Sequence, residues 1–332
     1  MVDPESSRLF KELRGAGLSR AAIEAAWPSW WNDEIAASAS GRAELRFTLA
    51  RKLGLVPKSL LGERVEFVWK DRARFKNLTT QSAVQQSILG SFGVSVGRLL
   101  LRATEPGIGL GRVSAERLRQ AILGSAMFVD LRQLIATCWG LGVPVIQLRV
   151  LPLSTKSMHA MVVESSGRFA ILLARDAQYP APIAFALAHE MGHIALDHLD
   201  GVAAIVDMED PALTTGQDVQ ELEANAYALE VLTGSSDPKI ETGVERFNAP
   251  TLARAVLAAS SEHRIEPGTL ALCVAYRQKV WPVAMSALHF IYSDSKPVWK
   301  DVNAIAAEEI NWSNLTDEAT SFLRNLMALN DV

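Results

Sequence analysis

Hydrophobic residues in the first 60 positions recur at helical spacing. Leu45, Leu49 and Leu53 stand four residues apart, as on one face of an amphipathic helix. Glycine and proline interrupt the pattern where helices are expected to end, for example at Gly15 and Pro28. The pattern predicts short helices over residues 8–14, 19–26 and 43–53, which together form a helical N-terminal module over residues 1–80.

The next part of the chain has a different residue composition. Residues 81–111 are dotted with Gly and Ser, so we expect them to connect two parts of the protein. Ser114 stands at an N-cap position ahead of a helix that begins at Ala115. A second helix is predicted over residues 129–139.

Short β-rich runs then appear at 143–150, 158–164 and 169–174, with a hairpin turn at 165–167. A helix follows, with Pro182 in its first turn, and is expected to end near Leu199. Further helices are predicted over 219–232 and over most of the chain from Ala249 onward. These elements indicate an α+β domain at 112–235 and a helical C-terminal region at 236–332.

Composition points to a globular intracellular protein. The chain has 332 residues, of which 49% are hydrophobic, enough for a substantial core. Its only cysteines, Cys138 and Cys273, lie far apart, which argues against a disulfide framework. The polar N-terminus and the lack of a long apolar run predict a soluble, cytoplasmic protein with no membrane association.

Charge is spread unevenly along the chain. The net charge is −4 overall, whereas residues 1–80 carry 14 Lys and Arg against 10 Asp and Glu. A mildly basic N-terminal part could contact nucleic acid. At this magnitude we favour an ordinary solvated helical surface.

The sequence HEMGH lies on the helix that contains Pro182. His189 and His193 are four residues apart, so they project from one face of the helix and can bind one ion. Imidazole nitrogens suit Zn²⁺. Glu190 is then the expected general base, which takes a proton from the attacking water and passes it to the leaving amine.

The next helix offers a third zinc ligand. Its sequence QELEANAYALEVL contains Glu221 and Glu223, of which we favour Glu221. The metzincin pattern would need Gly at 196 and His at 199, where this chain has leucines. His198 is therefore expected to lie outside the metal shell.

A second polar residue stands beside Glu221 on this helix. Asn225 follows one turn later, so one of the two can bind the metal while the other orients a ligand histidine. Asp218 and Glu221 also have the D-x-x-E form of a capping box. That form would explain Glu221 without any metal, so both interpretations stay open at this point.

With both motifs in view, residues 117–232 resemble the ImmA/IrrE family of zinc metalloendopeptidases. In that family an AHELGH-like helix precedes a helix of the form E-x-E-A-N-x-F-A. Here the two read AHEMGH and ELEANAYA, with Tyr227 where phenylalanine is common. The resemblance implies a zincin-like α+β fold, His189, His193 and Glu221 as ligands of Zn²⁺, and Glu190 as catalytic base.

The same resemblance implies a biological role. Family members cleave transcriptional repressors, typically helix-turn-helix proteins, in stress responses or mobile elements. We therefore expect a regulatory zinc metalloendopeptidase whose partner is such a repressor. One alternative is a DNA-binding regulator or sensor whose zinc domain is weakly or non-proteolytic. Another is an interaction protein without metal.

Part of the N-terminal module resembles Xre-type helix-turn-helix regulators. The similarity covers AELRFTLARKLGLVPKSLLGE and GLSRAAIEAA. The recognition helix would then fall in residues 28–40, which are poor in the basic and amide side chains that read bases. We favour a degenerate module that docks a partner over one that binds DNA.

The sequence leaves the group that stabilises the oxyanion open. Tyr227, His159 and Tyr179 are candidates, although a structural role is favoured for each. His159 lies in a predicted strand just upstream of the motif and is the first to test.

Overall fold

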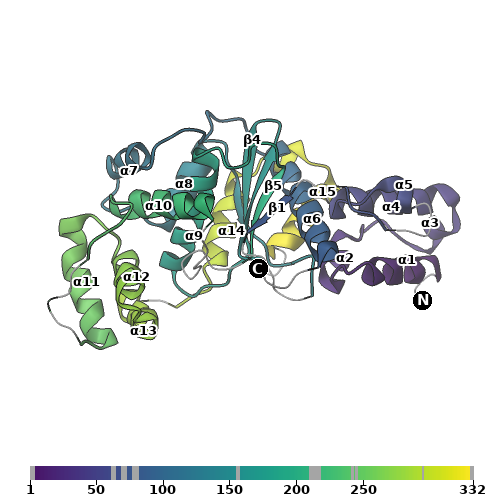
Figure 1. Cartoon of the computed structure of the whole chain (residues 1–332). Coiled ribbons are helices and arrows are strands. Elements are labelled where there is room, and N and C mark those ends of the chain that lie inside the picture. The colour runs from purple at the N-terminus through teal and green to yellow at the C-terminus, as the bar shows by residue number, and fades with distance from the viewer. Residues whose placement is uncertain are drawn as a thin grey trace.

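The computed structural model describes residues 4–60, 65–68, 73–76, 82–154, 158–208, 218–240, 243, 246–293 and 295–329. Within these residues the chain has an α+β fold, in which helices surround a mixed five-stranded sheet (Figure 1). The predicted α+β class is therefore confirmed. The described residues contain no helix that is long and apolar enough to cross a membrane.

The sheet has the strand order β1-β5-β3-β4-β2. Its strands are β1 (Ala73–Lys76), β2 (Val145–Gln147), β3 (Ala160–Ser165), β4 (Arg168–Leu173) and β5 (Ala204–Asp207). β3 runs antiparallel to both neighbours, whereas β1 pairs parallel with β5 and β2 parallel with β4. The hydrophobic pattern predicted β2, β3 and β4 but neither β1 nor β5.

The predicted hairpin joins β3 and β4. Ser166 and Gly167 form its turn, with φ angles of 56° and 75°. Two successive residues with positive φ match the right-handed twist of antiparallel strands. The hairpin therefore sets the register in which Ala160 faces Leu173.

Helix α6 (Ala83–Arg102) covers one face of the sheet. It fills most of residues 81–111, which were expected to be a connection, so that local expectation is wrong. A Cβ on Gly93 would lie 2.0 Å from Met161 Sδ, and one on Gly97 would lie 2.7 Å from Val163. These glycines are therefore contact positions that bring the helix close to β3, and their loop-like composition was misleading.

Helices α8 (Leu131–Gly140) and α9 (Pro180–Ala195) lie against the other face. Helix α10 (Val219–Thr233) packs on α9, and α7 (Ala115–Leu123) packs on α10. Ser114 caps α7 as predicted, because its side chain accepts a hydrogen bond from the Arg117 amide. α9 ends four residues before the predicted Leu199, and Asp197 after it has a left-handed φ of 61°. α9 packs most extensively against α10.

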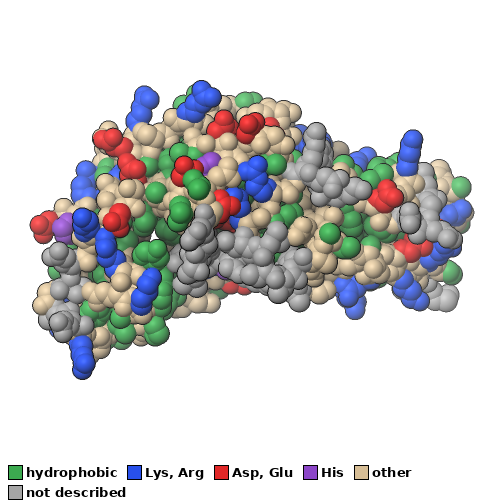
Figure 2. All heavy atoms as spheres, viewed as in Figure 1, with side chains coloured by type: hydrophobic (Ala, Val, Ile, Leu, Met, Phe, Trp, Pro, Cys, Tyr) green, Lys and Arg blue, Asp and Glu red, His purple; other side chains and the backbone are tan. Residues whose placement is uncertain are grey.

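The N-terminal helices lie at one end of the molecule (Figure 1). They are α1 (Pro4–Gly15), α2 (Arg20–Ala26), α3 (Asp33–Ala37), α4 (Ala39–Leu53) and α5 (Pro57–Leu60). The segment expected to hold a recognition helix forms only the five-residue α3, which begins with Asp33 and Glu34. Figure 2 shows acidic side chains among the basic ones over these helices. Neither feature favours contact with phosphates.

The C-terminal region is helical, as predicted: α11 (Ala249–His263), α12 (Pro267–Gln278), α13 (Trp281–Ile291), α14 (Trp299–Glu309) and α15 (Asp317–Met327). α11 to α13 enclose a small hydrophobic cluster of their own. α14 and α15 instead return to the main core, where they pack on β2 and α2. Asn303 fixes this return, because its amide donates to the carbonyls of Gln147 and Met327, each at 2.8 Å.

Candidate metal centre

The two histidines of HEMGH lie on α9, at the end nearest its C-terminus. The helix starts at a proline and continues through an alanine-rich apolar run. Proline in the first turn and alanine in the interior both favour helix formation. His189 and His193 are fully buried and lie one turn apart. Their Nε2 atoms are 3.0 Å from each other. The predicted pair of ligands on one helix face is therefore present.

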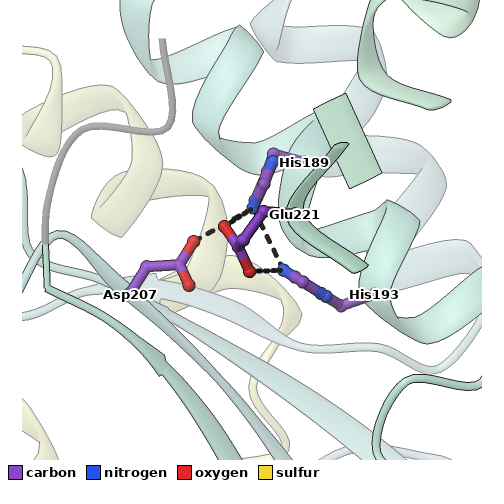
Figure 3. A group of neighbouring side chains, drawn as sticks. All are labelled: His189, His193, Asp207 and Glu221. Carbon is purple, nitrogen blue, oxygen red and sulfur yellow. Dashed lines mark hydrogen bonds and ion pairs between the residues drawn. The ribbon is translucent and has the colours of Figure 1, made fainter. Parts of the chain in front are cut away.

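Two carboxylates complete a cluster with these histidines (Figure 3). Glu221 comes from the first turn of α10, and its oxygens lie 3.4 Å from His193 Nε2 and 3.5 Å from His189 Nε2. Asp207 comes from the last position of β5, and its Oδ2 lies 3.1 Å from His189 Nε2. One ligand atom from each of the four residues lies within 4.8 Å of all the others. The cluster can therefore hold a metal ion.

Polar side chains hold the other nitrogen of each imidazole ring. Asn225 Oδ1 lies 3.0 Å from His189 Nδ1, which leaves Nε2 for the cluster. His193 Nδ1 lies 2.9 Å from His198 Nδ1, and His198 Nε2 in turn lies 3.2 Å from Glu223 Oε2. Partners of this kind fix the orientation and tautomer of ligand histidines.

This arrangement decides between the two glutamates of α10. Glu221 is 2% exposed and belongs to the cluster, whereas Glu223 is half-exposed and pairs with His198. The N-cap of α10 is Asp218, which accepts from the Gln220 amide. Both Glu221 oxygens point at the histidines without a hydrogen-bond donor among the described residues. The capping box therefore does not explain Glu221.

The charges of the cluster shift the pKa values of its members. Burial lowers the pKa of His189, but Asp207 and Glu221 outweigh it and raise the pKa to about 10. Burial and the charge of His189 lower the pKa of His193 to about 3. Burial would raise the pKa of Asp207, but contact with His189 holds it below its usual value. A proton on His189 thus offsets part of the negative charge of Asp207 and Glu221.

Glu190 is fully buried beside the cluster. Burial raises the pKa of Glu190 well above its usual value, and the negative charges of Asp207 and Glu221 raise it further. A hydrogen bond with Asp207 adds to this rise, so the protonated Glu190 carboxyl lies next to a member of the cluster. Glu190 can therefore hold a proton beside the candidate metal centre.

A buried cation stands behind Glu221. Lys76, at the end of β1, is 3% exposed, and its Nζ lies 3.7 Å from Glu221 Oε1. The same Nζ lies 2.8 Å from Asp218 Oδ2 and 3.0 Å from Gln220 Oε1. Lys76 therefore ties the start of α10 to the edge of the sheet and helps to position Glu221.

Comparison with known proteins adds no assignment to this site. No family model and no curated protein matches this chain. Membership of a peptidase family and the zincin-like fold therefore stay predictions. The buried cluster of two histidines and two carboxylates is a finding from the structure alone.

The remaining site candidates lie in other surroundings. The Tyr227 hydroxyl donates to the Val113 carbonyl at 3.0 Å, so it serves packing between segments and not the cluster. Tyr179 stacks on Tyr292 at 5.6 Å between ring centroids. His159 precedes β3, and its amide donates to the Asp207 carbonyl at 2.8 Å. Its backbone is thereby tied to a residue of the cluster.

Gly192 lies at the contact between α9 and α10. A Cβ there would lie 3.1 Å from the Ala224 backbone and 3.2 Å from Tyr227 Cβ, both on α10. Gly192 therefore permits the close approach of α9 and α10, which brings Glu221 to the histidines.

Sequence reasoning missed Asp207 and Lys76. Asp207 ends the apolar run AAIVD, and a polar residue closing a short buried strand was the available signal. Lys76 ends the strand ARFK in a charged stretch that carried no such signal. The two residues face each other in the parallel β1–β5 register.

Proposed function

We propose that this protein is a zinc-dependent regulatory metalloendopeptidase that cleaves a transcriptional repressor. The observation that carries the proposal is the meeting of His189, His193 and Glu221 from two adjacent helices, with Glu190 buried beside them. Imidazole and carboxylate ligands in this combination suit Zn²⁺. The HExxH pattern on α9 is that of metallopeptidases in which the glutamate is the general base.

The distances fit zinc. Zinc bonds to nitrogen or oxygen of about 2.0–2.1 Å place neighbouring donors of a tetrahedron about 3.3 Å apart. The two Nε2 atoms are 3.0 Å apart, and the Glu221 oxygens lie 3.4 and 3.5 Å from them. Both Glu221 oxygens are buried, and the Lys76 ammonium approaches only to 3.7 Å of Oε1, so a metal ion would supply a closer positive partner.

The side chains divide the chemistry among themselves. A zinc ion would supply Lewis acidity, which lowers the pKa of water and polarises the scissile carbonyl. Glu190 accepts the proton of the attacking water and passes it to the leaving amine. Its raised pKa suits it to hold that proton between the two steps. Asn225 and His198 keep the two imidazole rings in place throughout.

A groove beside the cluster supports a peptide as the substrate. It has a volume of about 430 Å³ and lies between α9, α10, α12 and α13. Asn225, which holds His189, forms part of its wall. Large apolar side chains line it: Phe185, Leu222, Leu229, Tyr276, Trp281 and Met285. Volume and lining suit apolar side chains of a peptide.

A charge placed in this groove should weaken substrate binding. Leu222 lines the groove and is half-exposed, so Leu222→Arg is expected to fold normally and to raise KM about tenfold. Zinc content should not change. Val219→Arg is the matched control, because Val219 is exposed on the same helix outside the groove. Equal KM values for the two variants would show that the substrate does not bind in this groove.

We propose a helix-turn-helix repressor as the substrate because of the resemblance of AHEMGH and ELEANAYA to ImmA/IrrE peptidases. One observation favours the alternative of a zinc-binding sensor that cleaves weakly or not at all. Asp207 adds a fourth protein donor, and zinc sites with four protein ligands are usually structural. The five-residue α3 gives no support to DNA binding.

Co-expression with a small helix-turn-helix repressor, taken from a neighbouring reading frame where one is present, tests the proposal. The expected result is a defined cut in the repressor, which purified zinc-loaded protein reproduces. A chelator should abolish the cut, and added zinc should restore it. An intact repressor alongside protein that carries about one zinc per chain would favour the sensor.

A further inference from the structure

We infer that Asp207 is a fourth protein ligand of the metal centre and closes it in this conformation, so that hydrolysis requires the Asp207 carboxylate to leave. The inference rests on the metal site of the proposed function and goes beyond the three-ligand pattern of HExxH peptidases. It depends on which atoms face one another, on burial, and on the loss of the His189 proton as a partner for Asp207 when His189 binds a metal.

The atoms that face each other identify the role of Asp207. Asn225 occupies Nδ1 of His189, so the ring presents Nε2 to the cluster. Asp207 Oδ2 lies 3.1 Å from that same Nε2. A nitrogen that binds a metal carries no proton to donate, so Asp207 cannot orient His189 by accepting its hydrogen bond in the metal-bound state. Its oxygen then points at the ion.

The separation of these atoms agrees with shared coordination. Donors at neighbouring corners of a tetrahedral zinc site lie about 3.3 Å apart. The distance of 3.1 Å from Asp207 Oδ2 to His189 Nε2 is close to this, as are the distances within the group of His189, His193 and Glu221. Asp207 thus meets this distance test against His189, and its ligand atom lies within 4.8 Å of those of His193 and Glu221.

The described partners of Asp207 are His189 and the Glu190 carboxyl. Its side chain is 1% exposed. Lys76 faces it in the β1–β5 register, but the Lys76 ammonium binds Asp218 and Gln220. Once His189 binds a metal through Nε2, that nitrogen has no proton to offer Asp207. A buried carboxylate then needs positive charge nearby, which the metal ion would supply.

Four protein ligands have a consequence for Glu190. Structural zinc sites are closed by four protein ligands, whereas catalytic sites keep one position open. With Asp207 bound, the fourth position is filled by a side chain, and the buried Glu190 has no reacting water to deprotonate. Departure of the Asp207 carboxylate, by side-chain rotation or displacement by a substrate carbonyl, opens that position. Asp207 is therefore a positioning residue that controls access to the metal.

Cobalt substitution of the full chain tests this directly, because Co²⁺ reports its coordination through visible absorption. The proteins compared are wild type, Asp207→Asn, Asp207→Ala and the exposed control Asp200→Asn. Azide is titrated into each Co²⁺-loaded protein as a small anionic ligand. The zinc affinity of each protein is measured by competition with a chelator.

In wild type and Asp200→Asn, the intense bands of a four-coordinate site should be insensitive to azide. In Asp207→Ala they should shift on addition of azide, and zinc affinity should fall at least tenfold. Asp207→Asn should also bind zinc with the lower affinity. Its absorption bands should shift on addition of azide, unless the new amide oxygen binds the metal in place of the carboxylate. Azide-sensitive wild type, or Asp207→Ala with unchanged bands and affinity, would overturn the inference.

These outcomes separate the inference from the proposed function. An azide-insensitive wild type that never cuts a repressor would refute the peptidase and leave Asp207 as a ligand. A protein that cuts its repressor, while Asp207→Ala keeps wild-type bands and affinity, would refute the role of Asp207 alone. The role of Asp207 is read from spectra and affinities alone, and repressor cleavage is measured separately.

Discussion

Replacing Glu190 by Gln is expected to lower kcat for repressor cleavage by a factor of about 10²–10⁴, while the zinc content stays equal to that of the wild type. Gln has the size of Glu but cannot accept the proton of the attacking water. Glu190 is fully buried beside Asp207, and the Gln amide can still donate a hydrogen bond to Asp207, as the protonated Glu190 carboxyl does. Removal of a carboxyl beside Asp207 and Glu221 should also leave thermal stability equal or higher.

Single-turnover cleavage and metal analysis of the same preparation measure this prediction. Glu309→Gln is the matched control, because Glu309 is exposed on α14. The control should cleave at the wild-type rate. Glu190→Gln protein that binds zinc and keeps more than about a tenth of the wild-type rate would show that Glu190 is not the general base.

The second large effect concerns zinc binding itself. Glu221→Gln is expected to weaken zinc binding by at least about 10²-fold, because a charged ligand becomes a neutral amide. Glu223→Gln should change it by less than about tenfold, because Glu223 reaches the cluster only through His198. The two residues lie two positions apart on one helix, so the pair is a matched comparison.

Zinc-dependent stability measures the same contrast. Ligand at about 1,000 times its Kd stabilises a folded protein by about 4 kcal/mol. Wild type and Glu223→Gln should therefore show a clear rise in Tm when zinc is added after chelation. Glu221→Gln should show little rise at the same zinc concentration. If Glu223→Gln lost the zinc-dependent rise in Tm while Glu221→Gln kept it, Glu223 and not Glu221 would be the metal ligand.

Local sequence signals were sufficient for much of the site. The spacing of His189 and His193 follows from helix geometry alone, and the N-cap at Ser114 and the hairpin at 165–167 are also local. Glu221 and Asn225 could be paired because they stand one turn apart on α10. The structure places both where that reasoning put them.

The missed parts depend on contacts between distant segments. β1 and β5 pair across about 130 residues, and each is only four residues long, too short for a periodic signal. Asp207 reaches the histidines only because that pairing places the end of β5 beside α9. The glycines of α6 were taken for loop residues because their contact with β3 cannot be read from local sequence.

X-ray absorption at the zinc edge of the purified full chain tests the metal centre most directly. We expect about one zinc per chain, bound by nitrogen and oxygen at about 2.0–2.1 Å, with the scattering signature of two imidazoles and no sulfur. His189 and His193 are the source of those imidazoles. Protein that retains less than about 0.2 zinc per chain when zinc is plentiful, or that binds it through Cys sulfur, would contradict the account.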